Sequence, residues 1–123
     1  MDTLLKTIKE SPTSVVFDNV LSVIDQHYDY RPTAFSNGLG NETLANEAGS
    51  NEGSCRIFAF AQQHKLSEQE TLACFGHHYF DAVLNHPDGT DHMNIRTFMK
   101  YGWRGIRFAG QPLKPKHSVA DCS

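Results

Sequence analysis

The hydrophobic positions at the start of the chain follow a helical period. Residues 1–10 carry Leu4, Leu5 and Ile8 and predict a short, weakly amphipathic helix that Pro12 interrupts. A stronger helix follows, for which we expect Thr13 or Ser14 to be the N-cap. Its apolar side chains recur at the spacing of one helix face: Phe17, Val20, Leu21, Ile24 and Tyr28.

Three further helical patterns occupy the rest of the chain. An apolar run predicts a helix over residues 54–64. Ser67 and Glu70 then have the spacing of a capping box, which predicts the start of a longer helix over 68–85. A third helix is predicted to begin after Thr90 or Asp91 and to end near Gly102.

Only two segments have an extended pattern. Pro32 disfavours helix in residues 30–36, and residues 104–109 alternate polar and apolar side chains, so the two could pair as a small sheet. We therefore predict a mainly α (α+β) fold with four to five helices and at most a small two-stranded antiparallel ribbon. We expect one domain over residues 1–123, with 111–123 as a flexible tail because it has no periodicity.

Composition narrows the class of protein. The net charge of −3 argues against nucleic-acid partners, which usually require a basic excess. The longest uninterrupted apolar run, residues 57–61, is far shorter than the roughly 18 residues that span a bilayer, so no membrane segment is expected. Three cysteines and no signal-peptide pattern favour a reducing cytoplasm.

The segment 36–53 has the most unusual composition, with four glycines and four asparagines. A long loop of this kind is often functional. It could equally be a surface loop that uses glycine and asparagine at positive φ angles.

A cysteine follows this loop. Cys55 falls in the first turn of a predicted helix, where the helix dipole could lower its thiol pKa and make it a nucleophile. His92 is a candidate base for such a site. The alternative is that Ser54 caps the helix and Cys55 is a small packing residue.

The histidines suggest a further possibility. His77, Asp81 and His92 could contribute to a transition-metal site, but adjacent His77 and His78 should point about 100° apart on a helix and cannot chelate one ion together. No established zinc motif is present, so we expect no metal site and no cofactor.

His92 and Arg96 stand one turn apart on the last predicted helix. Two cationic groups there suit an anionic ligand or a carboxylate from elsewhere, such as Glu47 or Asp81. A structural ion-pair network would explain them equally well.

Taken together, these motifs resemble the HopJ type III effector family. The matching blocks, over roughly residues 14–113, are Asn37-Gly38, Asn46 to Cys55, Thr71-Leu72 with Phe75-Gly76, Asp91 to Phe98, and Gly102-Trp103. The resemblance implies a small bacterial protein, located in the bacterial cytoplasm or delivered by type III secretion into a host cell. It implies no biochemical activity. Asp2 and Glu10 make the N-terminus only a partial match to a type III secretion signal, which is usually poor in acidic residues.

The leading hypothesis is that a polar surface, formed by the 37–55 loop and the 91–96 helix start, binds a ligand or a protein partner. That partner would be a host protein if the chain is secreted. The expected binding residues are all polar: Asn37, Asn46, Asn51, Ser54, Asn94 and Arg96. The alternatives are a cysteine-dependent hydrolase or transferase that uses Cys55 and His92, and a transition-metal-binding protein. Whether the chain is an enzyme is left open.

Overall fold

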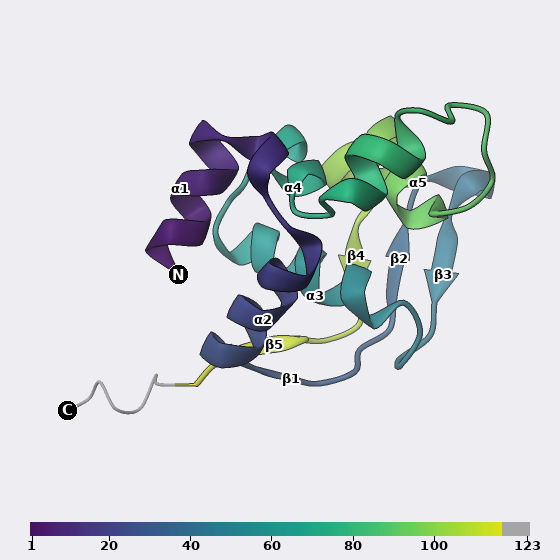
Figure 1. The fold of residues 1–123 in the computed structure, drawn as a ribbon. Helices are drawn as coiled ribbons and strands as arrows, with labels where there is room; N and C mark the ends of the chain where they lie inside the picture. The colour runs from purple at the N-terminus through teal and green to yellow at the C-terminus, as the bar shows by residue number, and fades with distance from the viewer. Residues whose placement is uncertain (117–123) are drawn as a thin grey trace.

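The computed structural model describes residues 1–116 of the chain. Helices predominate, and short strands form two small antiparallel sheets (Figure 1). The prediction of a mainly α fold with some β structure is confirmed, although the strands are more numerous than the single ribbon that the sequence predicted. None of the helices within residues 1–116 combines the length and the apolar character needed to cross a membrane.

Two helices and a short connecting turn form the N-terminal part. They are α1 (Asp2–Glu10), a 3₁₀ turn over Pro12–Ser14, and α2 (Phe17–His27). Thr13 and Ser14 lie in the turn, and the N-cap of α2 is Val16. Helix α2 ends where β1 (Tyr28–Tyr30) begins, so Tyr28 lies in a strand and not on the predicted helix.

The three-stranded sheet joins distant parts of the sequence. Its order is β3-β2-β4, built from β2 (Phe35–Asn37), β3 (Leu44–Asn46), and β4 (Arg107–Phe108), with a 3₁₀ turn over Gly40–Glu42 between β2 and β3. Phe35 pairs with Phe108, so the predicted contact between the two extended segments is present.

The second sheet contains residues that were predicted to belong to a flexible tail. Strand β5 (Leu113–Pro115) pairs with β1, and Leu113 is fully buried. Its apolar side chain completes the core, so the chain is held as far as residue 115. Residues 117–123, the remainder of the predicted tail, lie outside the described residues.

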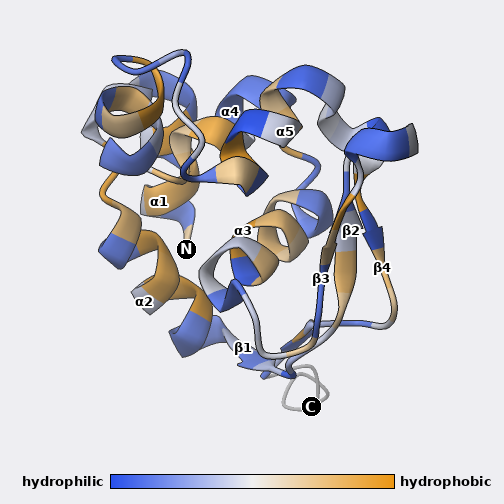
Figure 2. Ribbon diagram, turned by 90° about the vertical axis from the view of Figure 1, so that its right-hand side faces the viewer, coloured by the Kyte–Doolittle hydropathy of each residue, from blue (hydrophilic) through white to orange (hydrophobic). Residues whose placement is uncertain are grey.

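Helix α3 (Glu52–Gln63) lies between the N-terminal helices and the three-stranded sheet (Figure 2). Phe58 on α3 is fully buried, and its ring contacts Phe35 on β2 and Phe98 on α5 (Met93–Tyr101), with centroids 6.0 and 5.0 Å apart. Burial of such aromatic rings is a dominant stabilising contribution in a core of this size. A 3₁₀ turn over Gly102–Gly105 links α5 to β4.

The predicted helix over 68–85 is divided in two. Its capping box is present, because Ser67 and Glu70 exchange the two expected hydrogen bonds at the start of α4 (Glu68–Ala73). Gly76, three residues beyond the end of α4, then adopts a left-handed conformation (φ 56°) and turns the chain. A side chain there would lie 2.9 Å from the backbone nitrogen of Phe17, so α2 packs too closely for any other residue. A π-helical turn follows over His78–Val83.

Candidate functional site

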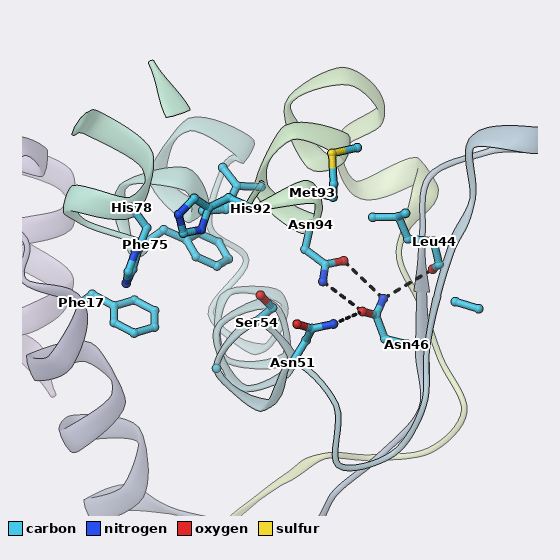
Figure 3. Close-up of a pocket in the computed structure, with 13 residues that line it drawn as sticks. Phe17, Leu44, Asn46, Asn51, Ser54, Phe75, His78, His92, Met93 and Asn94 are labelled. Carbon is cyan, nitrogen blue, oxygen red and sulfur yellow. Dashed lines mark hydrogen bonds between the residues drawn. The ribbon is translucent and has the colours of Figure 1, made fainter. Parts of the chain in front are cut away.

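An open cavity of about 530 Å³ lies between the N-termini of α3 and α5. Its polar lining comes from the two segments that the sequence analysis singled out, together with one histidine from the π-helical turn: Asn46, Asn51, Ser54, His78, His92 and Asn94. Its apolar lining is Phe17, Leu44, Ala45, Phe75, Met93 and Ile95, with Gly53 beside them. Figure 3 shows the asparagines on one side of this space and the aromatic and imidazole rings on the other.

Three asparagines form a connected ladder along one wall. Asn51 Nδ2 donates to Asn46 Oδ1 over 2.7 Å. Asn46 and Asn94 exchange two hydrogen bonds, of 3.2 and 3.0 Å, through their side-chain amides (Figure 3). Asn46 and Asn94 are buried, and the hydrogen bonds between their amides hold this wall in one arrangement.

Asn37 lies behind this ladder and does not line the cavity. Its side chain is fully buried on β2 and donates to the backbone oxygen and the Oδ1 of Asn94, over 2.8 and 3.1 Å. The predicted binding residue therefore supports the first turn of α5 from below.

Helices α3 and α5 both begin at the cavity, and neither has a side-chain cap at its N-terminus. Their N-cap residues, Asn51 for α3 and His92 for α5, each have a φ of 51° and make no capping hydrogen bond. Asparagine and histidine tolerate this left-handed conformation better than most residues. The first N–H groups of a helix have no partner within it, so the first turns of α3 and α5 provide hydrogen-bond donors at the cavity.

Two imidazoles form the opposite wall. The ring centroids of His78 and His92 are 5.1 Å apart, and His78 also stacks on His77 at 4.2 Å. Burial lowers the pKa of His78, and the neighbouring His77 and His92 lower it further, while Asp18 acts in the opposite direction. The expectation that His77 and His78 face apart is wrong, because the regular helix that it assumed ends before Gly76.

Arg96 does not join this cavity. Its guanidinium donates to the backbone oxygens of Asp91 and His86, over 2.6 and 2.7 Å, and to the Asp91 carboxylate over 2.8 Å. Helix α5 begins at Met93, so Asp91 is free of a capping role and pairs with Arg96. Arg96 is thus part of a structural ion-pair network with Asp91 and does not line this cavity.

Cys55 lacks the environment of a nucleophile. It is 1% exposed, does not line the cavity, and its Sγ lies 3.6 Å from the backbone oxygen of Thr33. Burial raises the pKa of its thiol, contrary to the lowering that the sequence suggested. The helix begins at Glu52 and not at Ser54, so Cys55 has already turned into the core. The pairing of Cys55 with His92 thus has no support in the geometry.

The metal-binding alternative also lacks support in the part of the chain that the structure describes. Within residues 1–116, no three side chains of the ligand types His, Cys, Asp and Glu are arranged to hold an ion.

Sequence reasoning placed Asn46, Asn51, Ser54, His92 and Asn94 in one site, and the structure brings these five to one cavity. It did not identify His78, nor the apolar wall of Phe17 and Phe75. The sequence signals for this wall were Phe17 in the apolar stripe and Gly76, the residue that lets α2 approach the chain between α4 and the π-helical turn.

One of the comparisons with known proteins identifies a family for this chain. A family model described as HopJ type III effector protein matches residues 1–113. The crystal structure of VPA0580, a protein of unknown function, is similar over 94% of this chain and 93% of that chain, with 42% sequence identity and a TM-score of 0.89. Among curated proteins, none matches. The chain therefore belongs to the HopJ type III effector protein family.

Proposed function

We propose that this protein binds a small ligand in the cavity between the N-termini of α3 and α5. The observation that carries the proposal is the convergence of two uncapped helix starts on one concave space of about 530 Å³. Ligand pockets in proteins commonly span about 300–1,000 Å³ and combine apolar walls with a few fixed polar groups. The concave shape favours a small ligand over the protein partner, host protein included, that the sequence also allowed.

The cavity has polar groups that the fold itself does not use. No hydrogen bond within residues 1–116 engages the Ser54 hydroxyl or the ring nitrogens of His78. The polar group nearest to the His92 ring nitrogens in this part of the chain is the Asp91 carboxylate, 3.9 Å from Nε2. Leaving such groups unpaired costs stability unless water or a ligand satisfies them. The side chains of Asn46 and Asn94, in contrast, are hydrogen-bonded to each other and serve as a rigid wall.

A titration with three matched probes tests the proposal. Cinnamate, cinnamamide and cinnamylamine share one apolar body and differ in the charge of one group, so they cover anionic, neutral and cationic ligands. At about 0.3 kcal/mol for each of roughly eleven heavy atoms, dissociation constants in the millimolar range are expected. The readout is the shift of backbone amide resonances in the ¹⁵N-labelled protein.

We expect at least one probe to shift the amide resonances of Asn51, Ser54 and Met93 and to leave those of Asn19 and Asn85, which do not line the cavity, unchanged. A Ser54→Trp variant, whose indole would occupy the cavity, should lose this response. The proposal fails if all three probes at about 10 mM leave the cavity resonances unmoved, or if the Trp variant responds as the parent does.

Type III delivery into a host cell is a separate hypothesis that rests on the family description. A fusion of the full chain to a reporter enzyme that is active only inside host cells tests it. Signal that depends on an intact secretion apparatus supports delivery, and equal signal with a defective apparatus contradicts it.

A further inference from the structure

The charge of the cavity wall narrows the chemistry of its ligand. Among the described residues that line it there is no Asp, Glu, Lys or Arg, and the only ionisable side chains are His78 and His92. The wall can therefore be neutral or positive, and never negative. A cationic ligand would gain no counter-charge from these lining side chains, whereas an anionic one would be attracted by a protonated imidazole.

We propose that the ligand of this cavity is an amphipathic carboxylate, and that protonation of His78 and His92 controls its binding. This inference rests on the proposed function. The carboxylate would lie against the two imidazoles and the Ser54 hydroxyl. The apolar body would lie against Phe17 and Phe75, whose rings stand beside His78 in Figure 3.

The arrangement of the imidazoles supports this assignment. Their rings are in contact, with centroids 5.1 Å apart, and two neighbouring imidazolium ions repel each other. An oxyanion between them and the first turns of α3 and α5 would relieve that repulsion and form charge-assisted hydrogen bonds, which are about twice as strong as neutral ones. The unpaired N–H groups at both helix starts add partial positive charge on the same side.

The charged groups around the histidines are few. His78 meets His77 from its own turn, His92 from the start of α5, and Asp18 from α2. His92 meets Asp91, which is already paired with Arg96. Burial and the two neighbouring histidines lower the pKa of His78, so its imidazole in the unliganded cavity holds a proton less readily than a free one does. Binding of a carboxylate should therefore be accompanied by uptake of a proton.

Isothermal titration calorimetry of the full chain tests this coupling. The probes are cinnamate and cinnamamide, titrated near pH 5.5 and near pH 8 in about 0.15 M salt, which screens the overall charge of the protein. Cinnamate remains ionised at both values because a carboxyl titrates at about 4.3. Buffers with different ionisation enthalpies give the number of protons taken up on binding.

We expect cinnamate to bind about tenfold more tightly at the lower pH, the gain typical of a hydrogen bond to a charged group. Cinnamamide should change by less than about twofold, since it has no charge to pair. His78→Gln and His92→Asn should each reduce the pH dependence and the proton uptake. His86→Gln, a matched change at an exposed histidine outside the cavity, should alter neither.

Three results would overturn the inference: cinnamate affinity that does not vary with pH, equal pH dependence for cinnamamide, and no cinnamate binding at either pH. If cinnamamide alone binds in the cavity, the proposed function stands and the anionic ligand is refuted. If a histidine variant fails to fold, the comparison of the two probes on the parent protein still decides the matter.

Discussion

Asn94 connects the first turn of α5 to the cavity wall, and its replacement by alanine measures the strength of that connection. The change removes three side-chain hydrogen bonds among buried groups: one donated to Asn46 over 3.0 Å and two accepted from Asn37 and Asn46 over 3.1 and 3.2 Å. Asn37 keeps its bond to the backbone oxygen of residue 94. At about 1 kcal/mol for each net hydrogen bond, Asn94→Ala should lower the free energy of unfolding by about 3 kcal/mol.

Urea denaturation followed by circular dichroism measures this loss. With an m-value of about 1.5 kcal/mol/M, the unfolding midpoint should fall by about 2 M. Asn85→Ala removes an asparagine that is exposed, and it should change the stability by no more than about 0.5 kcal/mol. A loss below about 1 kcal/mol for Asn94→Ala would refute the view that the amide ladder holds the wall together.

Further measurements test the strain at a tight turn, the reactivity of a buried thiol and the effect of one histidine on stability. Gly38→Ala places a Cβ 2.6 Å from the backbone oxygen of Glu42 at a φ of 108°, and should cost more than about 2 kcal/mol in a urea titration. Gly49→Ala, at a φ of 91° in open space, should cost about 1 kcal/mol, and equal losses would contradict the steric argument. Because its pKa is raised, Cys55 in the native protein should resist iodoacetamide near pH 8, as read by peptide mass spectrometry; rapid modification below that pH would revive the enzyme hypothesis. Because the pKa of His78 is lowered in the fold, its contribution to stability is complete above its ordinary value of 6.5 and is lost as the pH falls through that value. His78→Gln should therefore lose less stability than the parent between about pH 7.5 and pH 5.5, and an equal or greater loss would contradict the lowered pKa.

Features set by neighbouring residues could be predicted from the sequence. The capping box of Ser67 and Glu70 depends on two residues three positions apart, and both of its hydrogen bonds are present. The stripe through Val20 and Ile24 likewise identified the buried face of α2. In both cases the local pattern and the global fold require the same arrangement.

Features set by distant contacts could not be predicted in this way. The helix over 68–85 has good local periodicity, but the approach of the Phe17 backbone requires Gly76 to turn the chain. That turn brings the His78 ring 5.1 Å from the His92 ring, a contact that no local spacing indicates. The sequence drew attention to these histidines, but it could not show which of their rings are in contact.

The sequence predicted which residues form the candidate site better than it predicted how those residues contact one another. The asparagines were identified by their number in a loop and at a helix start, and the structure shows that Asn46 and Asn94, 48 positions apart, bind each other. The sequence could not predict the pairing of Arg96 with Asp91, because Asp91 was expected to be a candidate N-cap of α5. The N-cap of α5 is His92, one residue later than Asp91, so the Asp91 carboxylate pairs with Arg96.

A crystal structure of the protein with cinnamate, grown near pH 5.5, would show whether the cavity between α3 and α5 binds a carboxylate. We expect the probe in that cavity, with its carboxylate within hydrogen-bond distance of His78, His92 or Ser54 and its ring against Phe17 and Phe75. An empty cavity at a probe concentration well above the dissociation constant measured in solution, or the probe bound only elsewhere, would contradict the account.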